Sequence, residues 1–154
     1  MKDPSVPLAR PRSGVRPRGP LVLVVDGDEA VRGVFATELA ASGFMVLEAH
    51  DGASAIEKAT QFGPHAVVLD LVLPGCDGLK VARRLREIDA TREVCLVAVS
   101  AMRSERGEPM ALAAGFDAFF AKPVMGATLI AELIRLLAKR AGRGPAADLT
   151  RVIR

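Results

Sequence analysis

Residues 66–78, with the sequence AVVLDLVLPGCDG, decide the fold of the chain. Four apolar residues, two of them β-branched, run directly into the carboxylate of Asp70, and Pro74 and Gly75 then end any regular element. A strand that is apolar on both faces belongs in the middle of a parallel sheet covered by helices. Because the functional groups of such sheets lie just beyond the carboxyl ends of the strands, Asp70 is predicted to lie at the mouth of a site. On this stretch alone, a carboxylate that simply ends a strand or caps a turn is the alternative.

The composition restricts the class of protein. The 154 residues suit one domain, and half of them are hydrophobic, which is enough for a sizeable core. No apolar run reaches the roughly 18 residues of a membrane span, and the N-terminus lacks an apolar signal segment, so a cytoplasmic protein is predicted. The two cysteines, Cys76 and Cys95, lack metal-ligand spacing and are expected to be free thiols.

The net charge of +3 is concentrated at the two ends of the chain. Residues 1–19 carry five Lys or Arg against one acid, and residues 139–154 carry the same, so the stretch between them is net acidic. We predict a disordered Pro/Arg-rich arm over 1–19, a folded domain over 20–140 and a flexible basic tail over 141–154. An acidic domain argues against nucleic-acid binding by the fold itself.

Five apolar strands are predicted to alternate with five helices along the chain. The strands are expected at 21–25, 44–48, 66–70, 94–99 and 117–121. This alternation predicts a parallel α/β sheet with right-handed crossovers.

The helices are predicted from apolar spacing and from end signals. The first ends at Gly43, the second lies between Asp51 and Gly63, and the third begins after Asp77 as N-cap. Because Gly107 and Pro109 oppose a helix interior, we expect a mobile loop over 102–107, a short helix over 108–114 and a last helix over 126–140. Two detailed expectations concern side chains: the first helix is expected to bury Val31, Val34, Phe35 and Leu39, and Arg83, Arg84 and Arg86 are expected to form a solvated face.

The predicted strand ends carry polar groups into one crevice. The groups are Asp26, Asp28, Asp70, Ser100 and Lys122. Carboxylates with open water positions suit Mg²⁺, and a carboxylate is also a nucleophile that forms an aspartyl phosphate. A metal ion, a lysine and a hydroxyl would neutralise the charge of a transferred phosphoryl group.

In these features the sequence resembles the receiver domains of two-component response regulators, over about residues 20–140. The motifs that carry the resemblance are Val24-Val25-Asp26-Gly27-Asp28, Asp70 with Leu73-Pro74-Gly75 and Asp77-Gly78, Val99-Ser100-Ala101, Ala114-Gly115 and Lys122-Pro123. The resemblance implies a three-layer, flavodoxin-like fold with strand order 2-1-3-4-5.

The resemblance also implies a role for each group at the strand ends. Asp70 would be the phosphoacceptor, receiving phosphate from a phosphohistidine on a sensor histidine kinase or phosphotransfer protein. Asp26, Asp70 and the backbone carbonyl of Val72 would hold Mg²⁺. Ser100 and Lys122 would contact the phosphoryl group.

Two further features follow from the same resemblance. The Lys122-Pro123 bond would be cis. Phe119 stands where the family has an aromatic switch residue, which acts together with Ser100; a fixed core aromatic is the alternative reading of this side chain.

One position departs from the family pattern. The acidic turn usually has two adjacent acids, the second of which touches the metal, and here that position is Gly27. Glycine offers no ligand, so Mg²⁺ affinity is expected to be reduced. Asp28 could compensate from one residue further on, although N-cap of the first helix is its more ordinary role.

The leading prediction is a phosphorylation-controlled switch without an attached output domain, which at most catalyses its own phosphorylation and dephosphorylation at Asp70. Its signal would reach a downstream protein target through the face made by 108–114, 117–121 and 126–140. The alternative is a degenerate, non-phosphorylated receiver that acts as a protein docking module, with basic ends that bind an acidic partner. A homodimer is left open, and nucleic acid is not an expected partner because neither basic end contains an aromatic residue.

Overall fold

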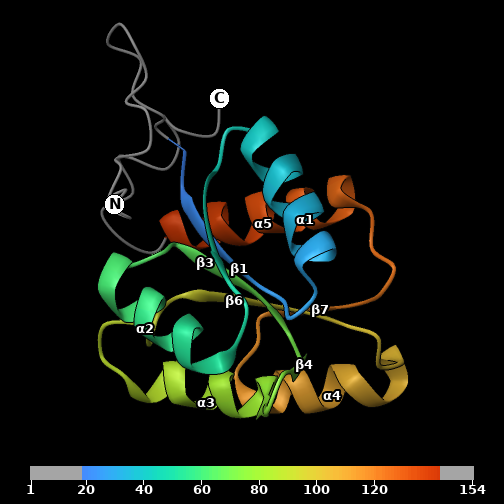
Figure 1. The fold of residues 1–154 in the computed structure, drawn as a ribbon. Helices are drawn as coiled ribbons and strands as arrows, with labels where there is room; N and C mark the ends of the chain where they lie inside the picture. Colours follow the sequence, from blue (N-terminus) through green and yellow to red (C-terminus); the bar gives the residue numbers. More distant parts are fainter. Residues whose placement is uncertain (1–18, 143–154) are drawn as a thin grey trace, which may run out of the picture.

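The computed structural model describes residues 19–142, and these form one parallel sheet between two layers of helices (Figure 1). Residues 1–18 of the predicted basic arm and residues 143–154 of the predicted tail lie outside the described residues. The strands of the sheet follow the order β2-β1-β3-β6-β7. Counted along the chain, this is the predicted order 2-1-3-4-5. The strands are β1 (Leu21–Val25), β2 (Met45–Ala49), β3 (Ala66–Asp70), β6 (Cys95–Ser100) and β7 (Ala118–Ala121).

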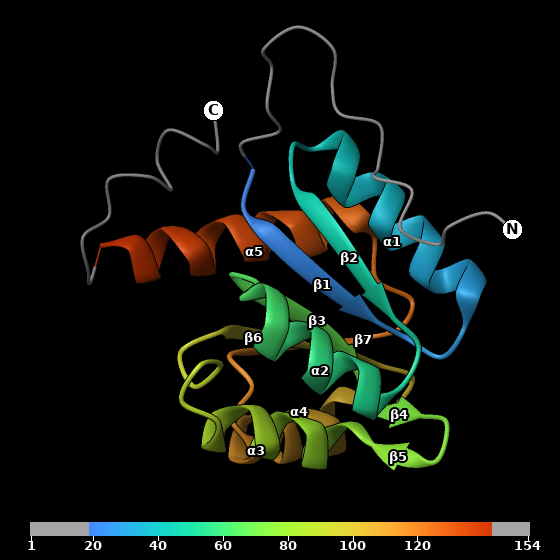
Figure 2. The same ribbon diagram turned by 60° about the vertical axis from the view of Figure 1, so that its left-hand side comes forward.

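Two helices cover one face of the sheet and three cover the other, as Figures 1 and 2 show from two directions. The first layer contains α1 (Glu29–Ala41) and α5 (Gly126–Ala141), and the second contains α2 (Gly52–Phe62), α3 (Gly78–Glu87) and α4 (Ser104–Ala114). Each layer packs its own apolar cluster against the sheet. Within residues 19–142, no helix is both long and apolar enough to cross a membrane.

Double burial explains why the three central strands could be recognised from sequence. Every residue of β3 and β6 is buried, as expected for strands with helices on both faces. The edge strand β2 is only partly buried. Its first residue is Met45 rather than Phe44, and β6 and β7 likewise begin one residue later than predicted.

The segment after Asp70 contains a small hairpin that the sequence did not predict. Pro74 and Gly75 connect β4 (Val72–Leu73) to β5 (Cys76–Asp77), and Gly75 takes a left-handed φ of 63° that suits glycine. The expectation that Pro74 and Gly75 end all regular structure was therefore wrong. Asp77 caps α3 as predicted, because its carboxylate accepts a hydrogen bond from the Leu79 N–H at 2.9 Å.

The expected loop over 102–107 is helical from Ser104 onward, and this part joins the expected short helix over 108–114 in one helix. α4 begins at Ser104 and contains both Gly107 and Pro109. Gly107, Ala111 and Ala114 are buried at helical spacing against the sheet. Packing of this small-residue stripe outweighs the local cost of glycine and proline, which is why the sequence pattern was misleading here.

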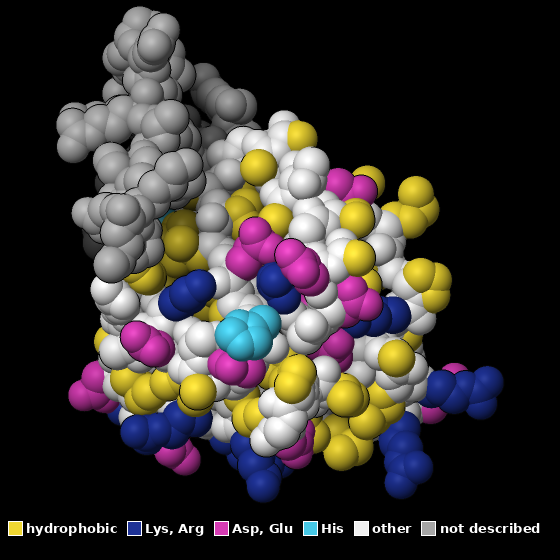
Figure 3. Space-filling model, in the orientation of Figure 1, with side chains coloured by type: hydrophobic (Ala, Val, Ile, Leu, Met, Phe, Trp, Pro, Cys, Tyr) yellow, Lys and Arg dark blue, Asp and Glu magenta, His cyan; other side chains and the backbone are white. Residues whose placement is uncertain are grey.

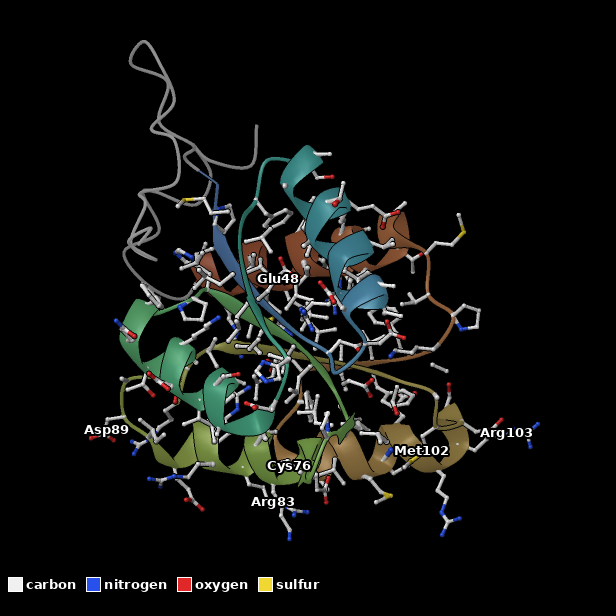
Figure 4. All side chains as sticks on the ribbon, in the orientation of Figure 1. Glu48, Cys76, Arg83, Asp89, Met102 and Arg103 are labelled. Carbon is white, nitrogen blue, oxygen red and sulfur yellow. The ribbon has the colours of Figure 1, made fainter. Side chains whose placement is uncertain are left out.

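Two side-chain predictions were also wrong. Val34 was expected in the core, but it is 57% exposed, because α1 turns Phe35 and Leu39 inward instead. Arg86 was expected on a solvated face, but its guanidinium reaches the backbone carbonyls of Arg92 and Gly115. Arg83 does project away from α3 (Figure 4).

A single carboxylate connects the two helical layers at the start of β7. Asp117 accepts hydrogen bonds from Arg86 of α3 at 3.1 Å, from Arg140 of α5 at 2.9 Å and from the Leu96 N–H at 2.8 Å. Because α3 and α5 lie on opposite faces of the sheet, Asp117 holds both helices to the same strand.

The two cysteines are expected to differ in reactivity. Cys95 is buried in β6, and burial, with the nearby Asp117 charge, raises the pKa of its thiol to about 12. Cys76 is half-buried in β5. In folded protein at pH 8, we expect a disulfide reagent to modify Cys76 and leave Cys95 unmodified, whereas both react in denaturant. Mass spectrometry of the modified peptides checks this, and rapid modification of Cys95 in folded protein would contradict it.

Candidate functional site

The carboxyl ends of β1, β3 and β7 bring three of the predicted groups into direct contact. The Nζ of Lys122 lies 2.8 Å from Oδ2 of Asp26 and 2.8 Å from Oδ2 of Asp70. The Lys122-Pro123 bond that follows is cis, as the resemblance implied. One ammonium therefore bridges two carboxylates contributed from distant parts of the chain.

The two carboxylates are largely removed from solvent. Their side chains are only 6% exposed for Asp26 and 10% exposed for Asp70. Burial alone lowers the pKa of Lys122, but the hydrogen bonds and charges of both aspartates outweigh it and raise that pKa above its ordinary value. Lys122 therefore carries a full positive charge at neutral pH, and its ammonium lies within reach of any group bound at Asp70.

Val72 directs its backbone toward the Asp70 carboxylate. Its N–H donates to Oδ1 of Asp70 at 3.0 Å. The carboxylates of Asp26 and Asp70 offer oxygen atoms, the ligand type that Mg²⁺ prefers.

Asp28 is the N-cap of α1. Its carboxylate accepts hydrogen bonds from the N–H groups of Ala30 and Val31 at 2.9 and 3.2 Å. Its backbone N–H donates to Oδ1 of Asp26 at 2.9 Å, which orients that carboxylate. Within residues 19–142, no three or more His, Cys, Asp or Glu side chains converge as a metal-binding cluster. Asp28 thus has a capping role in this structure.

Gly27 lies directly beneath the ring of Pro74. A Cβ added at Gly27 would lie 2.7 Å from Cδ and 3.0 Å from Cγ of that ring. A proline ring is bonded to its own backbone nitrogen and cannot swing aside as a long side chain does. A side chain at position 27 would therefore require the β4–β5 hairpin to shift, a consequence of a contact between distant residues that sequence patterns do not reveal.

Ser100 and Phe119 lie toward α4. Ser100 is fully buried at the end of β6, and its hydroxyl accepts a hydrogen bond from the Met102 N–H at 3.2 Å. Phe119 is half-buried and packs against the cluster beneath α2, α3 and α4. The structure thus places the hydroxyl close to the strand ends and the aromatic ring under a neighbouring helix.

Two surface grooves adjoin the site, and sequence analysis identified neither. An apolar groove of about 620 Å³ runs between α1 and the segment after β7; it is lined by residues that include Val31, Val34, Lys122 and Met125. A polar groove of about 460 Å³ lies over the end of β2 and includes Arg32, Glu48 and Lys58. Figure 3 shows acidic and basic side chains interleaved on that face, and Figure 4 shows Glu48 on the ribbon.

The polar groove is connected to the acidic turn through Arg32. Its guanidinium donates to the backbone carbonyl of Asp26 at 2.8 Å and pairs with Glu48 at 3.1 Å. Arg32 therefore contacts the backbone of Asp26, whereas Lys122 contacts its carboxylate.

Over residues 22–134 the chain matches the response regulator receiver domain family, and it belongs to that family. It is 40% identical over 121 residues to the transcriptional regulatory protein PrrA of Mycobacterium tuberculosis. The matched region covers 79% of this chain and 51% of PrrA. The chain spans about half the length of the curated relatives it matches.

Solved receiver structures have the same fold. One is the receiver domain of the sensor histidine kinase PA1611 from Pseudomonas aeruginosa, whose structure has a magnesium ion coordinated in the active site cleft. It is 28% identical to this chain with a TM-score of 0.72, and the match covers 78% of this chain and 98% of that chain. A CheY-like receiver domain protein from Methanospirillum hungatei has a TM-score of 0.76 at 21% identity, covering 82% and 99%. The second likeness concerns the fold alone.

Proposed function

We propose that this chain accepts a phosphoryl group on Asp70 from a phosphohistidine of a sensor histidine kinase or phosphotransfer protein, and uses it to switch a protein-interaction face. The observation that carries the proposal is the position of the Lys122 ammonium, 2.8 Å from both Asp26 and Asp70. A positive charge fixed beside a buried nucleophilic carboxylate supplies the neutralisation that phosphoryl transfer requires. A location in the cytoplasm is part of the same proposal.

The chemistry follows from the placement of these groups. A carboxylate oxygen of Asp70 forms a bond to phosphorus while the phosphorus–nitrogen bond of the donor breaks, and the imidazole leaves with the electron pair. Lys122 pairs with the charge on the phosphoryl oxygens, and the hydroxyl of Ser100 donates to one of them once it turns from Met102. Mg²⁺, held by Asp26, Asp70 and the Val72 carbonyl, would add positive charge at the same oxygens.

Binding of Mg²⁺ is proposed to be weak because Gly27 contributes no third carboxylate. We expect Gly27→Asp alone to lower the melting temperature, since the new Cβ meets the Pro74 ring at 2.7 Å. With Pro74→Ala added, the double variant should bind Mg²⁺ roughly tenfold more tightly than wild type, because affinity rises with ligand charge. Titration calorimetry measures this, with Pro74→Ala alone as the control. Equal affinity in the double variant and wild type would contradict the role given to Gly27.

Intact mass tests the phosphoacceptor role. Wild-type protein incubated with Mg²⁺ and a small phosphodonor is expected to gain one phosphoryl group, and Asp70→Asn is expected to gain none. Asp77→Asn is a matched control, because it removes a carboxylate seven residues away while Asp70 stays intact. A gain in Asp70→Asn equal to that of wild type would overturn the assignment.

The proposed function also requires surfaces that bind partner proteins. The apolar groove beside Lys122 adjoins the site, so a phosphodonor protein that contacts Val34 and Met125 would reach Asp70. The output face would comprise α4, β7 and α5, where Leu112 of α4 is exposed. A downstream protein target or a second copy of the chain would bind there.

A second candidate function is a docking module that is not phosphorylated. Gly27 favours it, because this position lacks the carboxylate that the family usually has there. In this version the basic ends of the chain bind an acidic partner. Absence of any phosphoryl gain, in wild type and in Gly27→Asp/Pro74→Ala alike, would favour this candidate.

A further inference from the structure

Gly107 lies in α4 beside the ring of Phe119. A Cβ added to Gly107 would lie 2.6 Å from Cζ and 2.8 Å from Cε2 of that ring. Real Cβ atoms do not approach other atoms so closely, so any side chain at position 107 excludes the present position of the ring. The backbone of Gly107 is helical, and the glycine is therefore required by space rather than by its φ angle.

The same glycine lies beside the residue that holds Ser100. Cγ of Met102 lies 3.4 Å from the added Cβ position, and the Met102 N–H donates to the Ser100 hydroxyl at 3.2 Å. Figure 4 shows Met102 beside the first turns of α4. The space beside Gly107 thus lies between the Phe119 ring and Met102, and the N–H of Met102 contacts the Ser100 hydroxyl.

We propose that Gly107 is a positioning residue that holds the Phe119 ring inward beneath α4 and keeps the Ser100 hydroxyl turned toward Met102. With the slot open, the ring is inward before any group is bound at Asp70. A larger residue at 107 would move the ring outward and shift Met102. The consequence for Ser100 rests on the proposed function, whereas the position of the ring does not.

The melting temperature of Gly107→Ala tests whether the added Cβ collides with the Phe119 ring. Helix propensity raises the melting temperature of this variant, and a collision lowers it. Alanine favours a helix over glycine, so in open space this substitution raises the melting temperature. Against the Phe119 ring we expect it to lower the melting temperature by roughly 5 °C instead. In a Phe119→Ala background the collision is absent, and Gly107→Ala should raise the melting temperature. Phe119→Leu replaces Phe119→Ala if the latter does not fold.

Gly33→Ala is the matched control. Gly33 also lies inside a helix, and nothing lies within 4 Å of its added Cβ. It should raise the melting temperature in both backgrounds. A Gly107→Ala variant that behaves like Gly33→Ala in the presence of Phe119 would overturn the proposal.

NMR gives a readout that general stability does not affect. The chain has no Trp or Tyr, so its aromatic signals come from six Phe and two His, and Phe119→Leu assigns the ring. We expect nuclear Overhauser contacts between this ring and the Gly107 α-protons in wild type. In Gly107→Ala, contacts from the ring to residue 107 should be lost and the amide signal of Met102 should shift.

Phosphoryl gain separates this inference from the proposed function. If wild type is phosphorylated, Gly107→Ala should change its rate while Gly33→Ala leaves it unchanged. If wild type gains no phosphoryl group, the proposed function fails, and the melting and NMR results still decide the role of Gly107. Unchanged ring contacts in Gly107→Ala would overturn the inference in either case.

Discussion

Replacing Lys122 with methionine is expected to slow phosphoryl gain at Asp70 by roughly 100-fold or more. Methionine keeps most of the apolar stem but removes the ammonium that lies 2.8 Å from both Asp26 and Asp70. Two buried carboxylates then face an incoming phosphoryl group without a positive side chain between them. The two carboxylates also repel each other and the phosphoryl oxygens more strongly once the ammonium between them is gone.

The measurement is the time course of intact mass with a small phosphodonor. Lys80→Met serves as a control, because Lys80 is an exposed lysine on α3. Circular dichroism shows whether the Lys122 variant is folded under the same conditions. Transfer at a rate within threefold of wild type, in folded Lys122→Met, would contradict the role given to this ammonium.

The second large effect is expected on stability. It concerns Asp117, which lies at the amino end of β7, whereas the site lies at the carboxyl ends of the strands. Asp117→Ala should lower the free energy of unfolding by roughly 2–4 kcal/mol. The substitution leaves Arg86, Arg140 and the Leu96 N–H without their shared acceptor. The value lies below that of a fully buried pair because the Asp117 side chain is 27% exposed.

Denaturant unfolding of Asp117→Ala and Asp89→Ala compares this network with an ordinary surface pair. Asp89 pairs with Arg92 on the surface and is 91% exposed, so its loss should cost less than about 0.5 kcal/mol. Figure 4 shows Asp89 at the end of α3. Equal effects of the two substitutions would mean that Asp117 does not hold the two helical layers together.

The strands of this fold could be predicted because their signal is local. In β3 and β6, burial on both faces produces an unbroken apolar run, and the polar groups that end the strands stand out against it. Because the carboxyl ends of parallel strands lie at one side of the sheet, the positions of Asp26, Asp70 and Lys122 at strand ends predicted that they would meet, without any knowledge of side-chain packing.

The features that were mispredicted depend on contacts between distant residues. α4 contains Gly107 and Pro109 because the helix packs on β7, which local propensity does not register. Arg86 donates hydrogen bonds to Gly115 and Asp117, which lie some 30 residues further along the chain. Its own segment contains neither partner and therefore predicts an exposed basic face. In α1, both Val34 and Phe35 fit the apolar stripe, and only the orientation of the helix on the sheet decides which one is buried.

The packing of Pro74 on Gly27 also has a consequence for how this sequence can change over time. A substitution that introduces an acid at position 27 meets the proline ring at once and is disfavoured while that ring is present. An acid at position 27 therefore requires the β4–β5 hairpin to move as a unit, because the ring is bonded to its own backbone. How this sequence can change at position 27 thus depends on how far the hairpin after Asp70 can move.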